Sequence, residues 1–386
     1  MHHIVGGYPH HVLRDLAKQY GPLMHLQLGE VCVVVVTSSE MAKNVLKTHD
    51  LAFGSRPKHL VTDIITYDSR DIAFSPYGDY WRQMCKICVM ELLNAKNVRL
   101  FSSIIHDEVV HLIDSIRSSS SSGEPFNFTE MMIWFASSMI CRSAFGQLLK
   151  DQDIFIKLIR EVLRLADQGF DMSDIFPSYK FLHGLRGVKQ KNLDVHHKVD
   201  SIVEDVINEH KKIFANHKTS DDGLEGGEDL IDVLLRLMKD KDMLTGGTET
   251  TSTTTIWAMA EMMKNPSIFA KAQEEVRESF RDKVKFDKYD VEELKYLKLV
   301  VKESLRLHPP IPLSVPRECR EETDINGYTI PVKTKVLINV WALGEMTRKA
   351  LSQRDLNSVL WTLMVIILNF FPLVVGGGFV LGYHLV

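Results

Sequence analysis

Cysteine is scarce in this sequence, and neither sign of charge is in large excess. Five cysteines are spread unevenly over 386 residues, so a disulfide framework is not expected and a reducing compartment is favoured. The formal net charge of -4 gives no reason to expect nucleic acid as a partner. Residues 1–7 lack the apolar segment of a secretion signal. With 45% hydrophobic residues, the composition fits a large folded protein with an ample core.

Metal-ligand patterns are also missing. Cys85 and Cys88 form one Cys-x-x-Cys, without the second pair or the histidines that a zinc site would need. No metal site is therefore predicted there.

The C-terminal part of the sequence lacks charge. From Leu356 onward there is no Asp, Glu, Lys or Arg. Residues 359–375 form an apolar run of about 17 residues, at the lower limit for a membrane-spanning helix, and Asn369 and Pro372 interrupt it. We interpret this apolar run as an accident of the reading frame, for the reason given below, with a membrane anchor as the alternative.

The most informative segment of the sequence ends at Pro309 and Pro310. We call it the organising helix, because the other motifs of the chain are placed before and after it. Residues 290–308 predict an amphipathic helix that begins at Asp290 as N-cap and ends where the prolines stop it. Its apolar side chains recur at three- and four-residue spacing: Leu294, Leu297, Val300, Val301 and Leu305.

Glu303 and Arg306 lie three residues apart on this helix and share one face. The same face carries Leu299 beside the apolar stripe, so we expect the pair to point inward as a hydrogen-bonded ion pair. A surface ion pair of little energetic value is the alternative that the helix alone leaves open.

Elsewhere the pattern is mixed. Residues 24–28 and 31–36 predict a hairpin, residues 324–330 a second hairpin with an Asn-Gly turn, and residues 335–340 a further strand. Residues 101–116 predict a helix, and the serine-rich residues 117–123 predict a solvated linker.

Three short motifs occur in a fixed order around the organising helix. Gly-Gly-Thr-Glu-Thr-Thr begins at Gly246, Glu-x-x-Arg precedes the two prolines, and Pro-Arg-Glu begins at Pro316. In this order and spacing the chain resembles the haem-thiolate monooxygenases, the cytochromes P-450, and most of all their plant terpenoid- and alkaloid-oxidising branch. The resemblance runs from about His2 to Gly344. It implies a mainly α fold with small β-sheets, formed by residues 1–344.

The resemblance also implies functions for the residues of the first motif. Glu249 and Thr250 match the acid–alcohol pair that relays protons for oxygen activation. Gly246 and Gly247 match the positions where the helix leaves room for oxygen beside the haem. The alternative for this Thr-Glu-Thr cluster is helix N-capping.

Two further residues match groups that hold the haem propionates. Trp81 and Arg317 occupy these positions, whereas Cys85 stands where relatives carry an arginine. Ordinary core packing is the alternative for Trp81, and a solvated charge is the alternative for Arg317. The resemblance places three apolar residues in the substrate pocket: Ile311, Leu313 and Val315.

The resemblance breaks after Gly344. The family's axial ligand is a cysteine in a loop that reads FGGGRRICPG, but no cysteine follows Cys319 in this chain. Residues 373–386 can be written in codons that encode FGGGRRICPGISFG when read from one base earlier, and residues 352–357 likewise yield KPERFE. We therefore interpret residues 345–386 as an out-of-frame, non-homologous tail. A stretch that forms the first half of the central helix in relatives also has no counterpart before Gly246.

At the level of the family, the resemblance implies NADPH-dependent monooxygenation of small apolar secondary metabolites. It implies haem b as cofactor, NADPH-cytochrome reductase as electron donor, and a location on the cytosolic face of the endoplasmic reticulum membrane. Because the axial thiolate is missing, we expect the activity of the literal chain, that is, the protein with this sequence as it stands, to be impaired. Two alternatives stay open, namely an inactive haem-free fragment and a non-catalytic tail-anchored membrane protein.

Overall fold

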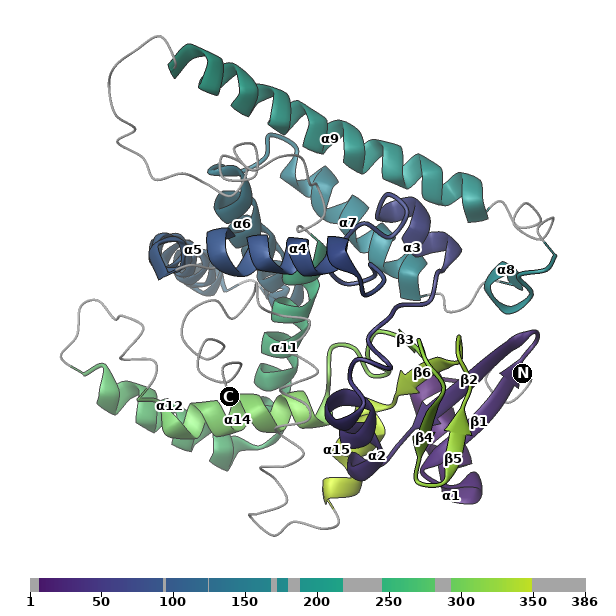
Figure 1. Ribbon diagram of the computed structural model, residues 1–386. Coiled ribbons are helices and arrows are strands. Elements are labelled where there is room, and N and C mark those ends of the chain that lie inside the picture. Colours follow the sequence, from purple (N-terminus) through teal and green to yellow (C-terminus); the bar gives the residue numbers. More distant parts are fainter. Residues whose placement is uncertain are drawn as a thin grey trace.

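The structure is a computed structural model that describes residues 7–92, 95–123, 125–167, 172–179, 188–217, 245–281 and 293–348. The sheets lie on one side of the molecule and most of the helices on the other, with α11 running between the helical group and α14 (Figure 1). The described helical segments are α1 (Pro9–Tyr20), α2 (Ser39–Lys43), η1 (Asn44–Thr48), α3 (Leu60–Ile65), α4 (Asp79–Ile87), η2 (Cys88–Leu92), α5 (Ala95–Ser122), α6 (Phe128–Phe145), α7 (Gln152–Asp167), α8 (Met172–Ile175), α9 (Val188–His217), α11 (Thr245–Lys264), α12 (Pro266–Ser279), α14 (Lys295–Leu307) and α15 (Val340–Arg348).

The larger sheet joins the two ends of the described chain. Its strand order is β1-β2-β6-β3, formed by β1 (Leu23–Leu28), β2 (Val31–Val36), β6 (Lys335–Ile338) and β3 (Arg317–Glu318). The predicted hairpin is confirmed as the antiparallel pair of β1 and β2. Strand β2 then pairs in parallel with β6, from Val33 opposite Lys335 to Val36 opposite Ile338. Four valines in a row suit a strand that is covered on both faces.

The second predicted hairpin is confirmed by β4 (Thr323–Ile325) and β5 (Tyr328–Ile330), which pair antiparallel. Its turn residues Asn326 and Gly327 have φ of 48° and 83°. These left-handed conformations are the ones that an Asn-Gly turn supplies at low cost.

The core is divided between the sheet and the helices. One cluster packs α2 and η1 against the sheet, with Phe53 and Val45 fully buried. A separate cluster centres on Phe145 of α6 and Phe155 of α7. Helix α11 contacts both α6 and α14, so it connects the helical group to the organising helix.

The organising helix starts later than its sequence pattern predicts. Helix α14 begins at Lys295, and the predicted N-cap Asp290 lies outside the described residues. Leu294, at the N-cap position, makes no side-chain cap. Glu275 of α12 instead accepts hydrogen bonds from the backbone N–H groups of Tyr296 and Leu297, each at 2.8 Å. A carboxylate from a neighbouring helix thus satisfies donors that a local cap would satisfy.

The prediction of a linker at residues 117–123 is wrong for most of that segment. Helix α5 continues to Ser122. The hydroxyls of Ser119 and Ser121 donate to the carbonyls of Ser115 and Arg117, at 3.1 and 2.8 Å. Such back-bonding lets serine remain in a helix despite its modest intrinsic propensity.

Among the helices that the structure describes, none combines the length and apolar character needed to cross a membrane. The apolar run at residues 359–375 lies outside the described residues.

Candidate active site

Helix α11 carries the residues matched to the proton relay. It is helical from Thr245, so Glu249 and Thr250 lie beyond its first turn, where an N-capping cluster would not be found. Thr250 is half-buried, and its carbonyl accepts the Thr254 hydroxyl at 2.8 Å. Gly246 and Gly247 are part of the helix, while the side chain of Glu249 is outside the described set. The relay therefore stays a prediction.

Thr251 is a residue of this helix that sequence reasoning did not single out. Its hydroxyl oxygen is buried and has no hydrogen-bond partner among the described residues. A buried unpaired hydroxyl costs about 1–3 kcal/mol, so this part of α11 suits a polar group or water at that position. The motif contains three threonines, and only tertiary packing distinguishes Thr251 from the others.

Arg306 and Glu303 form the expected ion pair on α14. Arg306 Nε donates to Glu303 Oε2 at 2.8 Å, and Nη2 donates to Oε1 at 2.6 Å. The Nη1 group donates to the carbonyl of Gly344 in α15. The two-point contact matches the planar geometry of a guanidinium and a carboxylate.

The expectation that the whole pair points inward is wrong for its acid. The Arg306 side chain is 3% exposed, but the Glu303 side chain is 48% exposed among the described residues. Leu299, one turn earlier, is also exposed. The apolar spacing therefore predicted correctly that Arg306 is buried. It did not predict that Glu303 and Leu299, which lie at the edge of the same helix face, are exposed to solvent.

Gly344 is required where α14 and α15 meet. A Cβ at this position would lie 2.2 Å from the Arg306 carbonyl oxygen. This distance is far inside any real contact, so the backbones can approach each other only because residue 344 has no side chain. Gly344, the last residue covered by the sequence resemblance, is thus in close backbone contact with α14.

Arg317 is buried on β3 and already has partners. Its Nη1 group donates to Asp50 Oδ1 at 2.7 Å and to the Phe53 carbonyl at 3.3 Å. The interpretation of Arg317 as a solvated charge is therefore wrong. Its expected contact with a haem propionate stays a prediction.

A partly buried arginine, Arg56, was missed in the sequence and lies close to Arg317. Arg56 Nη1 donates to the carbonyls of Val315 and Pro316, at 3.3 and 3.2 Å. Burial, followed by repulsion from Arg317, lowers the pKa of Arg56 to about 9. Arg56 thereby fixes the loop that carries the predicted pocket residues.

The predicted pocket residues differ in their surroundings. Ile311 and Leu313 are half-buried, and Val315 is buried. Leu313 packs against the apolar cluster on the β1–β2 side of the sheet. Ser314 between them has φ of 56°, a left-handed conformation that turns the chain sharply. Their contact with a substrate stays a prediction.

Trp81 lies on α4 and is half-buried. Its indole N–H donates to the Ile72 carbonyl at 3.0 Å, so in this structure the donor expected for a propionate is used by the protein. Cys85, one turn later, is a neutral group, since burial raises the pKa of its thiol to about 11. Arg82, the residue after Trp81, pairs with Asp79.

The described residues do not complete a haem–thiolate site. A thiolate ligand needs surroundings that lower the thiol pKa, whereas burial raises the pKa of Cys141 to about 12 and also raises that of Cys319. Cys32 lies on the β1–β2 hairpin beside His25. No group of three or more metal-binding side chains occurs in the described part of the chain.

The fold and the motif-bearing helices together define a protein of the haem monooxygenase class. The family model for cytochrome P450 matches residues 2–346, and the chain belongs to this family. This finding confirms the family and the mainly helical fold class predicted from the sequence. Members are haem-containing oxidoreductases that receive electrons from a reductase and act on hydrophobic substrates, and the plant members are generally bound to the endoplasmic reticulum membrane.

Three similar proteins come from plants. The chain is 71% identical over 360 residues to cytochrome P450 71D7 of Solanum chacoense, with 89% of this chain and 71% of the relative covered. It is 71% identical, with the same coverage, to 5-epiaristolochene 1,3-dihydroxylase of Nicotiana tabacum. It is 66% identical, over the same shares, to premnaspirodiene oxygenase of Hyoscyamus muticus.

Solved structures agree on the fold. A zebrafish cytochrome P450 structure with progesterone superposes with a TM-score of 0.75 at 22% identity, covering 95% of this chain and 86% of that one. A second structure of a zebrafish cytochrome P450, with abiraterone, gives a TM-score of 0.71.

Proposed function

We propose that this chain derives from an NADPH-dependent haem monooxygenase of terpenoids. Residues 1–344 correspond to that enzyme, and the segment that supplies the haem ligand is missing from the sequence. The observation that carries the substrate class is the 71% identity to an epiaristolochene dihydroxylase over 89% of this chain. A 66% identical premnaspirodiene oxygenase supports the same class. The proposal includes haem b, an NADPH-cytochrome reductase partner and the cytosolic face of the endoplasmic reticulum.

The division at residue 344 is part of the proposal. The family match ends at residue 346, which supports a cytochrome P450-like region over residues 1–344 and a non-homologous tail over 345–386. Arg306 still contacts the Gly344 carbonyl, so the last residue of that region keeps its place against α14. The codons described above predict that the gene encodes KPERFE and FGGGRRICPG in a reading frame shifted by one base from the frame of residues 345–386.

The central helix is proposed to be incomplete as well. The alignment with the first relative has 360 positions, which is more than the 89% of this 386-residue chain that it covers. This difference supports the presence in relatives of residues that have no counterpart here. A gap before Gly246 fits the short α11, which begins at Thr245. Glu249 and Thr250 are proposed as the relay, and Gly246 and Gly247 as the groove beside the haem.

Absorbance spectroscopy tests the state of the literal chain. We expect the purified protein, reduced and exposed to carbon monoxide, to lack the band of thiolate-ligated haem, because no cysteine follows Cys319. A full-length relative treated in parallel supplies the positive control. A band at the thiolate position would overturn the proposal that the literal chain lacks its ligand.

Sequencing the gene across the codon of Gly344 tests the origin of the tail. Codons that encode neither KPERFE nor FGGGRRICPG in any frame would contradict the frame interpretation. Alkaline extraction of membranes then tests the rival interpretation, which rests on the uncharged run at residues 359–375. A tail-anchored protein would stay in the membrane pellet, and deleting residues 356–386 would release it.

A further inference from the structure

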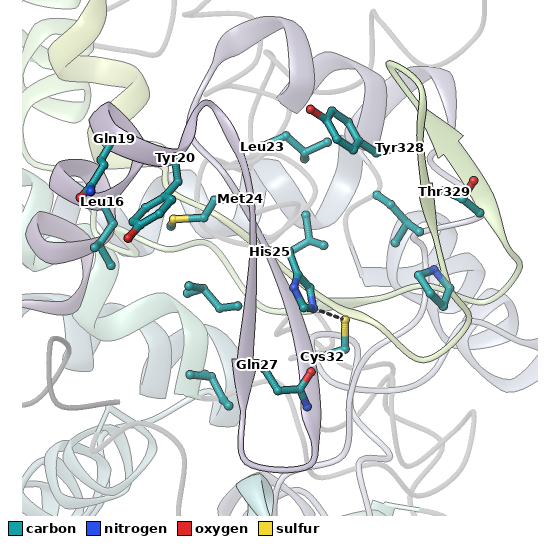
Figure 2. A pocket seen from close by; sticks show the side chains of 15 residues that line it. Leu16, Gln19, Tyr20, Leu23, Met24, His25, Gln27, Cys32, Tyr328 and Thr329 are labelled. Carbon is teal, nitrogen blue, oxygen red and sulfur yellow. Dashed lines mark hydrogen bonds between the residues drawn. The ribbon is translucent and has the colours of Figure 1, made fainter.

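A groove runs along the β1–β2 hairpin and takes residues from both faces of β1. It has a volume of about 590 Å³ and is lined by α1, both hairpin strands and β5. Leu23, on the same face of β1 as His25, contributes apolar surface together with Tyr328 and Pro331. Leu16 contributes it on the other face of β1. Figure 2 shows His25 and Cys32 on the side of β1 that faces Tyr328 and Thr329, with Met24 and Tyr20 on its other side.

His25 and Cys32 are in direct contact in this groove. The His25 Nε2 atom lies 3.1 Å from Cys32 Sγ. His25 is opposite Val34, and Cys32 is opposite Gln27, so the two side chains are diagonal neighbours on one face of the hairpin. In the tautomer with its proton on Nδ1, His25 accepts a hydrogen bond from the thiol. A base at hydrogen-bond distance is what activates a cysteine nucleophile.

The surroundings of Cys32 differ from those of the other cysteines. Cys141 and Cys88 are buried, and Cys319 is buried with its thiol directed at the Glu321 carbonyl, 3.0 Å away. Burial raises the pKa of Cys85 to about 11 and that of Cys141 to about 12, which disfavours their thiolates. Cys32 is half-exposed, lines a groove and has an imidazole beside it.

We propose that Cys32 is a covalent modification site for small apolar α,β-unsaturated carbonyl compounds, with His25 as its base. The apolar wall accommodates the carbon skeleton of such a compound beside the sulfur. The inference concerns the sheet and does not depend on haem.

The proposed reaction is a conjugate addition. His25 Nε2 takes the thiol proton, the sulfur bonds to the β-carbon, and the π electron pair moves onto the carbonyl oxygen as an enolate. The imidazolium then returns the proton to the α-carbon. No group leaves and nothing is oxidised or reduced, so the step needs no further reactant.

Competitive labelling of the full chain tests the site. The native protein is treated briefly with 2-cyclohexen-1-one, and parallel samples receive iodoacetamide, before the cysteine peptides are quantified by mass spectrometry. We expect the peptide with Cys32 to gain the enone mass before the peptides of the other cysteines, and Cys32→Ser to remove this product. Urea-denatured protein, in which the folded surroundings are lost, is expected to show no such preference.

Three variants separate the base from the groove. His25→Gln is expected to slow labelling of Cys32 by both probes at least about tenfold, since a positioned base commonly contributes two to four orders of magnitude. His111→Gln makes the same substitution at an exposed histidine of α5 that does not line the groove; it is the matched control and is expected to stay within about twofold. Tyr328→Ala removes an exposed wall residue and should slow the enone more than iodoacetamide.

The outcomes are distinct. Equal labelling of Cys85 and Cys32 in the native protein, or an unchanged rate in His25→Gln, would overturn the activated thiol. Equal slowing of both probes in Tyr328→Ala would overturn the apolar enone as the ligand class. Circular dichroism of each variant shows whether it has kept its fold, and because the assay needs no haem its result is separate from the test of the proposed function.

Discussion

At the scale of single residues, the contact of Arg306 with Glu303 and Gly344 is the most constrained part of the candidate site. Arg306 is almost fully buried, whereas Glu303 is half-exposed. Removing one member of the ion pair therefore has unequal effects. A buried guanidinium without its carboxylate keeps an uncompensated charge, but a half-exposed carboxylate without its guanidinium is hydrated.

We predict from this asymmetry that Glu303→Ala lowers the free energy of unfolding by about 3 kcal/mol, as expected for an unpaired buried charge. Adding Arg306→Met to Glu303→Ala removes that charge and should recover part of the loss. Urea titrations of the single and double variants measure both values. A double variant less stable than the sum of its single changes would show that the charge is not the cause.

Gly344 gives a second prediction at this scale. Gly344→Ala places a Cβ 2.2 Å from the Arg306 carbonyl oxygen, and forcing such a contact costs about 1–3 kcal/mol. Gly78→Ala is the matched control, because nothing lies within 4 Å of a Cβ there and its φ of -177° is extended. Thermal unfolding should shift for residue 344 and hardly at all for residue 78.

At the scale of helices and strands, the sequence predicted well wherever the signal was local. The β1–β2 hairpin and the Asn326-Gly327 turn follow from alternation and turn chemistry, and both are present. The Ser118–Ser122 run was misassigned, because composition does not reveal hydroxyls that bond back to the preceding turn. The capping of α14 by Glu275 joins residues 21 and 22 positions apart and has no local signal.

Helix α14 should therefore be sensitive to a change in α12. Glu275→Ala removes the acceptor for the N–H groups of Tyr296 and Leu297, and loss of a cap costs about 1 kcal/mol. The neighbouring exposed residue, changed as Glu274→Ala, is the control. Hydrogen exchange at the start of α14 should accelerate for residue 275 alone. Unchanged exchange would mean that these donors are satisfied in another way.

The contact between α11 and α14 gives a pH-dependent prediction. His308 stacks on Trp257, with ring centroids 3.8 Å apart, and contacts Glu261, which also pairs with Lys264. Lys264 first, and then His308, hold the pKa of Glu261 below its usual value. A lowered carboxyl pKa stabilises the fold above the unfolded-state value, and this contribution is lost as pH falls through the folded-state value.

Glu261→Gln should therefore cost about 1 kcal/mol at neutral pH, the upper range for an ion pair whose lysine is solvent-exposed. The difference from wild type should shrink as the pH falls below the ordinary carboxyl value of 4.5. Stability measured between pH 3 and 7 checks this. A constant difference across that range would exclude ionisation of Glu261 as the cause.

At the scale of the whole molecule, the family and fold class could be predicted because three motifs keep their order along the chain. Tertiary proximity could not be predicted in this way. Arg56 reaches the Val315 carbonyl across 259 positions, and the His25–Cys32 groove also takes residues from α1 and β5. The assignments of Glu249, Thr250, Trp81 and Arg317 stay predictions, since they concern a haem that must first be bound.

Repair of the reading frame tests the whole-molecule proposal. A chain in which KPERFE and FGGGRRICPG are restored after Gly344 is expected to gain the thiolate-type carbon monoxide band but to show little turnover, because the proposed gap before Gly246 would remain. Restoring the helix gap as well should add terpenoid oxidation, measured as oxygenated product by mass spectrometry. Full turnover after frame repair alone would contradict the proposed gap.

The parallel pairing of β2 with β6 has a consequence for synthesis of the chain. Residues 33–36 leave the ribosome early, but their partners are residues 335–338. At 5–20 residues per second, the valine-rich edge of β2 waits roughly 15 to 60 s for its neighbour. During that time an apolar strand edge is open to other chains. Dependence on chaperones during translation should therefore end abruptly once residue 338 has emerged.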